Sequence, residues 1–153
     1  MVCLILHNIR SVYNVGSIFR TADAAGVSKM YLTGYTPAPT DHFGRARKGI
    51  AKTALGAERT VTWEQHKTLL PLLRRIKAEG VAIIALEQSS HSVDYKSVRI
   101  RKPTAIILGN EISGIPKNIL TLCDIVAEIP MRGVKESLNV SVAVGIFLFR
   151  LLD

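Results

Sequence analysis

Short apolar runs recur along the chain with almost no polar interruption, and they constrain its fold more than any other feature. Residues 81–86, 104–108 and 125–129 each have the length of a strand, and only Glu128 breaks the pattern. Continuous apolar strands are typical of parallel sheets, in which helices cover both faces. Apolar residues at helical spacing occur between the runs. This alternation predicts an α/β fold with a mostly parallel sheet flanked by helices.

The other elements follow from the same spacing and from end signals. The expected strands are residues 2–6, 29–33 and 60–63, and the expected helices are residues 15–25, a short segment ending near Gly56, residues 64–79 and residues 138–152. Asn14 and Ser137 are typical N-caps for the first and last of these helices. Gly26 and Gly80 suit the left-handed residue that follows a helix. Pro71 either bends its helix or marks the true start.

The last predicted helix is apolar almost all round. Its two apolar sides are Leu138, Val142, Ile146 and Phe149 on one and Val140, Val144, Phe147 and Leu151 on the other. One side has too little local core to cover it, which favours a dimer interface. The longest apolar stretch, residues 138–149, is also well short of the roughly 20 residues that span a bilayer, so no membrane partner is expected.

Length and residue usage bound the remaining possibilities. At 153 residues, with no linker or repeat, the chain is expected to form one domain over residues 1–153. Cys3 and Cys123 lie far apart and outside any metal-binding spacing, and the four histidines are scattered. We therefore expect no disulfide framework, no metal and a reducing cytoplasm. The first residues lack the basic region and cleavage site of a signal peptide.

Basic residues outnumber acidic ones, and the net charge of +8 makes a polyanion the first partner to consider. Residues 1–102 carry the whole excess, because residues 103–153 hold four basic against five acidic side chains. The densest basic segment comprises Arg45, Arg47, Lys48 and Lys52. A solvated charged face is the alternative reading. Few aromatic residues accompany these cations, which gives little support to recognition of bases by stacking.

Three polar blocks follow predicted strands, at the edge where open α/β sheets bind ligands. They are residues 8–23, residues 107–116 and residues 129–143. Each block also has a purely structural interpretation. The first would be a helix cap with a surface arginine, the second a strand-to-helix turn, and the third a helix cap without a ligand. Glycine-rich nucleotide loops, zinc-protease motifs and the nucleophile elbow of hydrolases are absent from the sequence.

Together the three blocks resemble the SpoU/TrmH class of SPOUT RNA ribose 2'-O-methyltransferases, over nearly the whole chain. Asn14, Gly16 and Arg20 match the motif N-x-G-x-x-x-R, and Leu108 to Glu111 with Gly114 match L-G-N-E-x-x-G. Residues 129–143 match I-P-M-x-G-x-x-x-S-L-N-V-S-x-A. The resemblance implies a SPOUT fold with a deep C-terminal trefoil knot, S-adenosylmethionine as cofactor, an RNA substrate and a homodimer. The separate RNA-binding domain of many relatives is not expected in this chain.

The resemblance also assigns roles to residues. Its cofactor site comprises Leu86, Glu87, Leu108, Gly109, Asn110, Glu111, Ile129, Pro130, Met131, Ser137, Leu138 and Asn139. Its candidate catalytic residues are Arg20, Asn14, Glu111, Ser137 and Asn139. A guanidinium stays protonated at neutral pH, so we expect Arg20 to clamp a phosphate and stabilise developing negative charge rather than accept a proton. Asn14 would orient Arg20 or the nucleotide, while Glu111 and Asn139 shape the cofactor and dimer junction.

The RNA contacts expected from the same comparison come from the basic segment together with Arg10 and Arg20, chiefly to phosphates. The substrate is tRNA or rRNA, with tRNA favoured because small relatives often act there. Two other functions stay open. The first is a non-catalytic RNA-binding or RNA-assembly protein that keeps the knotted fold but has lost methyltransferase activity. An enzyme that methylates a base nitrogen would need an acidic base near the methyl group, and the arginine of the first block favours ribose instead.

Overall fold

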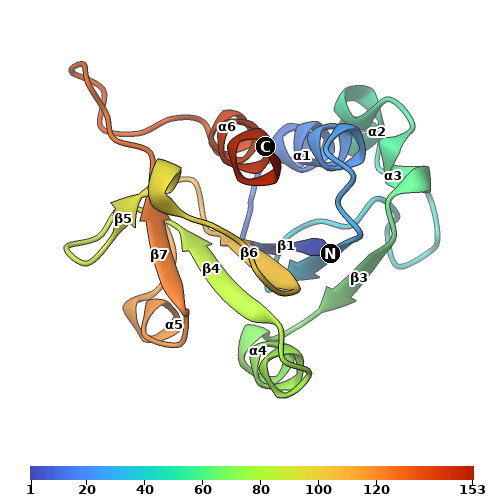
Figure 1. Ribbon diagram of the computed structural model, residues 1–153. Coiled ribbons are helices and arrows are strands. Elements are labelled where there is room, and N and C mark those ends of the chain that lie inside the picture. The colour runs from blue at the N-terminus through green and yellow to red at the C-terminus, as the bar shows by residue number, and fades with distance from the viewer.

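All seven strands run parallel in one sheet, which the computed structural model describes together with the rest of residues 1–153 (Figure 1). The strands are β1 (Val2–His7), β2 (Lys29–Thr33), β3 (Trp63–His66), β4 (Ala82–Leu86), β5 (Val93–Asp94), β6 (Thr104–Leu108) and β7 (Ile125–Glu128). Their order across the sheet is β3-β2-β1-β6-β4-β7-β5. The predicted α/β fold with a parallel sheet is confirmed, whereas the trefoil knot stays a prediction.

Helices cover both faces of this sheet. They are α1 (Val12–Ala24), α2 (Lys48–Ala54), α3 (Ala57–Thr60), α4 (Leu69–Ala78), α5 (Lys117–Leu120) and α6 (Val140–Leu152), with a short 3-10 turn, η1 (Tyr95–Ser97). In Figure 1, α1, α2 and α6 lie on one side of the sheet, and α4 and α5 lie on the other. In β1, Leu4 and Leu6 pack with the first group, and Cys3 and Ile5 pack with the second. Burial on both faces explains why the strand sequences are continuously apolar.

Helix α1 begins earlier than its apolar spacing indicates. Its N-cap is Ser11, whose side chain accepts a hydrogen bond from the backbone N–H of Asn14 at 3.2 Å. The prediction that Asn14 caps this helix is therefore wrong, and its amide is free for other partners. Gly26 has a φ of 71° directly after the helix, as predicted. Gly16 lets α1 approach α2, since a Cβ there would lie 2.0 Å from Thr53 Oγ1.

The region between α3 and α4 differs most from the prediction. The expected strand at residues 60–63 lies three positions too early, because Thr60 completes α3 and β3 begins at Trp63. Residues 64–66 belong to this edge strand and pair with β2, so the expected helix begins only at Leu69. Pro71 falls in the first turn of α4, where its missing N–H has no helical partner to lose.

The last helix, α6, starts at Val140 with Asn139 as its N-cap. Asn139 Oδ1 accepts hydrogen bonds from the backbone N–H of Ser141 at 2.9 Å and from its hydroxyl at 2.6 Å. The prediction that Ser137 caps this helix is wrong. One side of α6 is buried through Val144, Phe147, Leu148 and Leu151, while Val142, Ile146 and Phe149 stay exposed. None of the helices has the length and apolarity that a membrane span requires.

Candidate functional site

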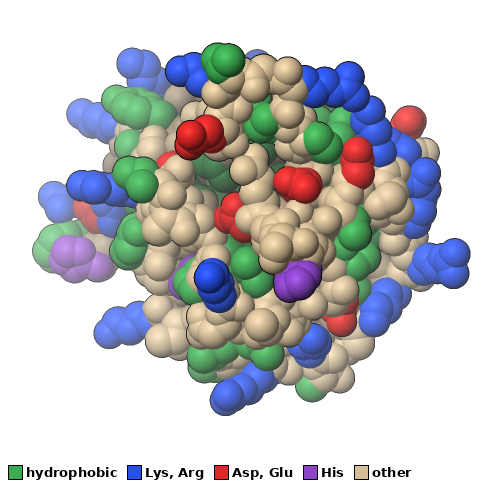
Figure 2. All heavy atoms as spheres, turned by 90° about the vertical axis from the view of Figure 1, so that its left-hand side faces the viewer, with side chains coloured by type: hydrophobic (Ala, Val, Ile, Leu, Met, Phe, Trp, Pro, Cys, Tyr) green, Lys and Arg blue, Asp and Glu red, His purple; other side chains and the backbone are tan.

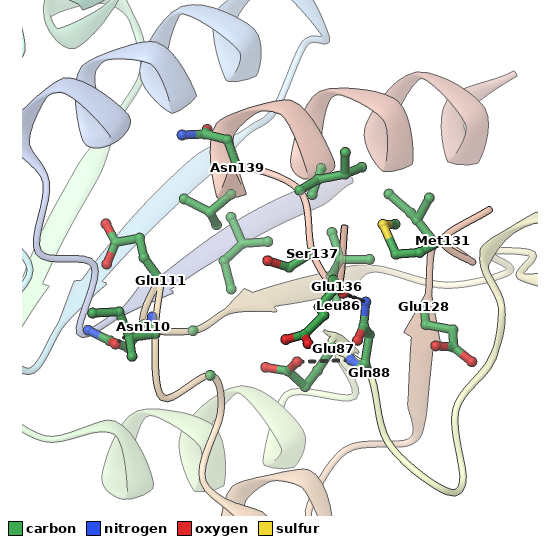
Figure 3. Close-up of a pocket in the computed structure, with 18 of the residues that line it drawn as sticks. Leu86, Glu87, Gln88, Asn110, Glu111, Glu128, Met131, Glu136, Ser137 and Asn139 are labelled. Atoms are coloured by element: carbon green, nitrogen blue, oxygen red, sulfur yellow. Dashed lines mark hydrogen bonds between the residues drawn. The ribbon is translucent and has the colours of Figure 1, made fainter. Parts of the chain in front are cut away.

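A cavity of about 550 Å³ lies at the carboxyl ends of β4, β6 and β7 (Figure 3). Strand order brings these ends together, because β4 pairs with both β6 and β7. The lining residues are Asn14, Leu86, Glu87, Gln88, Leu108, Gly109, Asn110, Glu111, Ile112, Gly114, Glu128, Ile129, Met131, Glu136, Ser137, Leu138, Asn139, Val140 and Ala143. The three polar blocks of the sequence thus meet at one edge of the sheet.

Every residue that the resemblance assigns to a cofactor site lines this cavity, except Pro130, which is exposed and lies outside the lining. The structure adds residues without a motif signal, among them Gln88, Glu128 and Glu136. Gln88 Nε2 donates to the backbone oxygen of Glu136 at 2.8 Å and joins the loop after β4 to the segment before α6. Only the position of Gln88 and Glu128 at strand ends, and of Glu136 before α6, marks these residues in the sequence, since their types are ordinary for a surface loop.

The lining combines apolar side chains with carboxylates. Leu86, Leu108, Ile129, Met131 and Leu138 provide apolar surface, and the acidic side chains in the lining include Glu87, Glu128 and Glu136. Figure 2 shows the face on which β5 lies, where acidic side chains gather near a central hollow and Lys and Arg are more frequent toward the edge. Such a cavity suits a ligand that joins a planar apolar part to a positive charge.

A chain of side-chain hydrogen bonds crosses the mouth of the cavity and joins all three blocks. Asn139 Nδ2 donates to Asn14 Oδ1 at 3.1 Å, and Asn14 Nδ2 donates to Glu111 Oε1 at 3.2 Å. Asn14 is the middle of this relay because an amide donates through nitrogen and accepts through oxygen. The relay therefore fixes the three side chains relative to one another.

Glu111 is also held by the backbone before α1. Its Oε2 accepts the N–H of Arg10 at 3.0 Å, and its Oε1 accepts the N–H of Ser11 at 3.1 Å. Partial burial opposes ionisation, but these N–H groups and the Asn14 amide outweigh it and lower the pKa of Glu111 below its ordinary value. The carboxylate is thus committed to hydrogen bonds and is a poor proton acceptor at neutral pH.

Asn110 and Glu87 build the loop that carries Glu111. Asn110 Oδ1 accepts from the backbone N–H groups of Ile112 and Ser113, and its Nδ2 donates to Tyr35 Oη, each at 2.9 Å. Glu87 Oε2 accepts the N–H of Ile115 at 2.9 Å. At Gly114, φ is 69° and a Cβ would lie 2.4 Å from Glu87 Oε2, so only glycine fits this position.

Arg20 lies apart from this arrangement. Its side chain is exposed on α1, lines no part of the cavity and forms no hydrogen bond to Asn14, whose amide is engaged by Glu111 and Asn139. The expectation that Asn14 orients Arg20 is therefore not met within one chain. Ser137 lines the cavity but is exposed and forms no hydrogen bond.

A second hollow of about 710 Å³ opens beside the cavity, across the ridge formed by Asn14, Asn110, Glu111 and Ile112. Its other lining residues are Arg10, Ser11, Val12, Tyr13 and Tyr35. Tyr13 and Tyr35 are more than half exposed, and Ile112 on the ridge is 93% exposed. This hollow offers ring faces and one cation next to the relay, a combination that suits a nucleotide.

The basic segment lies alongside. Arg45 and Arg47 precede α2, Lys48 and Lys52 lie on it, and all four are exposed. Lys52 Nζ is 5.9 Å from the centre of the Tyr13 ring, which connects this segment to the second hollow.

Neither the cysteines nor the metal-ligating side chains form a further centre. Cys3 and Cys123 are both free, and burial raises the pKa of each thiol, to about 11 for Cys123. No group of three or more His, Cys, Asp or Glu side chains is arranged to hold a metal ion.

Comparison with known proteins finds relatives that are named as RNA methyltransferases. The sequence profile of the SpoU rRNA Methylase family matches residues 1–149. The chain is 33% identical over 144 residues to the tRNA (guanosine(18)-2'-O)-methyltransferase of Escherichia coli K12, covering 94% of this chain and 59% of that protein. It is 35% identical over 150 residues to the 23S rRNA (guanosine-2'-O-)-methyltransferase RlmB of Ralstonia nicotianae, covering 95% and 56%.

The fold is likewise similar to that of a solved relative. The AdoMet-bound rRNA methyltransferase from Sinorhizobium meliloti superposes with a TM-score of 0.88 and 31% identity, over 97% of this chain and 54% of that one. The chain thus spans less than two thirds of the length of each of these three relatives.

Proposed function

The chain belongs to the SpoU rRNA Methylase family, and from this premise we propose that it is an S-adenosylmethionine-dependent methyltransferase acting on a ribose 2'-hydroxyl of RNA. The observation that carries the proposal is the Asn139–Asn14–Glu111 relay, which stands between a cavity suited to the cofactor and a hollow suited to a nucleotide. Relatives named for tRNA and for rRNA support an RNA substrate, and tRNA is the first to test.

The cavity fits S-adenosylmethionine by size and by chemistry. Its volume lies within the range of small-molecule sites. Leu86, Leu108 and Ile129 would contact the apolar adenine, while Glu87, Glu128 and Glu136 supply negative charge for a cationic ligand. When bound, this cofactor supplies a methyl group on a sulfonium leaving group. The residues of the chain hold the ligand and orient the acceptor.

The second hollow takes the target nucleotide in this proposal. The 2'-hydroxyl is on the sugar carbon next to the one that carries the base, so a ribose placed at the relay puts its base into the neighbouring hollow. Tyr13, Tyr35 and Ile112 offer the surfaces on which a base packs. Glu111 and the two asparagines then fix the ribose by hydrogen bonds, and positioning of this kind is a large part of catalysis.

We assign to Arg20 the phosphate of the target nucleotide and the negative charge that develops on the ribose oxygen. The proton leaves through phosphate or water, because a guanidinium has no acceptor atom. Arg20 lies outside both hollows of its own chain, so we propose that it acts across a homodimer formed through the exposed side of α6. Residues 1–153 would act as one methyltransferase domain in the cytoplasm.

Calorimetric titration with S-adenosylmethionine, followed by mass mapping of methylated nucleosides in added tRNA and rRNA, tests the proposal. Binding with a new 2'-O-methyl group supports it and identifies the substrate. A methylated base nitrogen or an absence of cofactor binding contradicts it, and absent binding favours the non-catalytic RNA-binding alternative. Asn139→Ala should weaken cofactor affinity, because it removes a residue of the lining and breaks the relay.

Arg20→Ala separates catalysis from cofactor binding. It should keep the affinity for S-adenosylmethionine and lose about 100-fold in turnover, the scale of removing a group that stabilises transition-state charge. Arg74→Ala is the matched control, since Arg74 is an exposed arginine on α4, on the other side of the sheet. Near-normal turnover of Arg20→Ala contradicts its assigned role.

A further inference from the structure

The loop between β2 and α2 holds a tight turn that one carboxylate organises. Asp41 Oδ1 accepts the backbone N–H groups of Phe43 and Arg45 at 2.9 and 3.0 Å, and Asp41 Oδ2 accepts Arg45 Nε at 2.9 Å. The backbone N–H of Asp41 donates to the oxygen of Arg45 at 2.8 Å, and that of Gly44 donates to the oxygen of Asp41 at 2.9 Å. Residues 41–45 are therefore ordered by their own contacts.

This turn presents an aromatic ring to solvent. Phe43 is 70% exposed, although apolar rings are usually buried. The centres of the His42 and Phe43 rings are 3.9 Å apart, and the Arg45 guanidinium lies 4.8 Å from the centre of the Phe43 ring. The residue is largely open to solvent on a turn that is already ordered, so a ligand would lose little conformational freedom of the loop on binding.

The surroundings of this ring are strongly basic and lead back to the proposed nucleotide hollow. Arg47 and Lys48 follow the turn after Ala46, and Asp41, the acidic residue of the turn, is paired with Arg45. Helix α2 is fixed to α1 where Thr53 Oγ1 donates to the backbone oxygen of Tyr13 at 2.9 Å. Tyr13 lines the hollow, and Lys52 lies over its ring. A run of cations thus connects the Phe43 ring, which Arg45 contacts, to the Tyr13 ring, which Lys52 contacts.

We propose that Phe43, with His42, is a stacking site for an unpaired nucleobase of the RNA substrate, distinct from the base that enters the hollow. Arg47, Lys48 and Lys52 contact the phosphates between the two points. Phosphate groups bind cationic side chains, and every nucleobase has a face that can stack on an aromatic ring. RNA is therefore a ligand that would use both the basic side chains and the exposed ring. The inference rests on the proposed function for the nature of the substrate, and it implies a preference for RNA with unpaired nucleotides over a continuous duplex.

The experiment compares the affinity of variants of the 153-residue chain for unfractionated tRNA and for a blunt RNA duplex of similar length. Phe43→Ala should weaken tRNA binding by about 5- to 150-fold, the range for loss of one stacked base, with duplex binding unchanged. Phe43→Leu should behave like alanine, because it keeps apolar surface without a ring. Phe43→Trp should keep the affinity, and its added fluorescence should be quenched by tRNA.

Three outcomes would overturn the inference. The first is that Phe43→Ala and Phe43→Leu bind tRNA like the wild type. The second is that both variants lose affinity for tRNA and for the duplex equally. The third is that tRNA leaves the fluorescence emission of Phe43→Trp unchanged. Thermal unfolding of each variant controls for folding, since an exposed side chain should alter stability little. A wild-type chain that methylates tRNA while Phe43 is dispensable contradicts the stacking site alone, whereas a wild type that binds neither tRNA nor rRNA contradicts the proposed function as well.

Discussion

Asn14 joins two groups that require opposite hydrogen-bonding partners. Its nitrogen donates to the Glu111 carboxylate and its oxygen accepts from the Asn139 amide. An amide does both through two separate atoms, whereas a carboxylate has no donor and an ammonium or guanidinium has no acceptor. The position therefore makes a strong demand on residue type that a helix N-cap would not make.

Asn14→Asp should turn this contact into a pH-dependent repulsion. The new carboxylate would lie against Glu111, and two carboxylates at that distance cannot both ionise without cost. The folded protein then holds a proton that the unfolded chain releases at neutral pH, so the loss of stability should be largest near pH 8 and should shrink as the pH falls toward about 5. Thermal unfolding across this range measures it.

The neutral variant Asn14→Ala is the control. It loses the same hydrogen bonds without adding a charge, so its difference from wild type should not vary with pH in this way. A difference for Asn14→Asp that is equally flat with pH would contradict the repulsion and, with it, the contact to Glu111.

The sequence identifies the residues of the site better than it identifies their partners. Asn14, Glu111 and Asn139 all stand out as polar residues beside apolar strands. However, Asn14 and Glu111 are 97 positions apart in the sequence, and Asn14 and Asn139 are 125 positions apart. Spacing within a helix instead points from Asn14 to Arg20, a pairing that the structure does not contain. Gly16 likewise matches a motif, and its visible role is the close approach of α1 to α2.

At the scale of elements, β3 is an edge strand tied to its neighbours by charge. Glu64 forms ion pairs with Lys29 of β2 and Arg75 of α4, and a hydrogen bond with His66 Nε2 of β3. The Lys29 contact contributes most, and together these contacts lower the pKa of Glu64 from 4.5 to about 2. The polar composition of this strand is what made its residues resemble the start of a surface helix.

Glu64→Gln should reduce the loss in free energy of unfolding that the wild type shows as the pH falls below about 4.5. A depressed pKa means that the carboxylate contributes stability above pH 4.5, and that this contribution is lost as the pH falls toward about 2. Because the Glu64 side chain is 37% exposed, screening by solvent reduces the contribution to about 1 kcal/mol. Urea unfolding at several pH values measures it, with Glu79→Gln, directly after α4, as an exposed control that forms no ion pair. Parallel profiles for wild type and Glu64→Gln would contradict the assignment.

The bounds of an element could be predicted from the sequence where burial alone determines its residue types. The bounds of β2 and β6 agree with their apolar runs, because both are covered on two faces. Strand β5, Val93–Asp94, is exposed and too short to leave a pattern. Helix α6 began two residues later than its apolar run, since Asn139 and not Ser137 satisfies the first free N–H groups.

For the whole molecule, the exposed side of α6 predicts self-association. Val142, Ile146 and Phe149 are 50%, 39% and 55% exposed on one side of the helix. Ile146→Asp should leave the monomer folded and abolish the dimer, because a carboxylate buried in an apolar interface costs several kcal/mol. Sedimentation velocity measures this, and Leu122→Asp, at the end of α5, is the control. A monomeric wild type, or an Ile146→Asp variant that still dimerises, would contradict the proposed interface.

The distribution of charge over the whole molecule predicts how RNA binding depends on salt. Basic side chains near the proposed RNA path belong to residues 1–102, whereas residues 103–153 carry slightly more acidic than basic groups. Each phosphate contact releases a counterion, so Lys48→Gln should weaken binding to all RNAs alike and reduce the slope of log K against log salt by about 1. Lys117→Gln, an equally exposed lysine on α5, should leave the slope unchanged. If the slopes of log K against log salt are equal for the wild type and Lys48→Gln, Lys48 does not contact an RNA phosphate. The RNA would then bind elsewhere, since a cation that contacts no phosphate releases no counterion on binding.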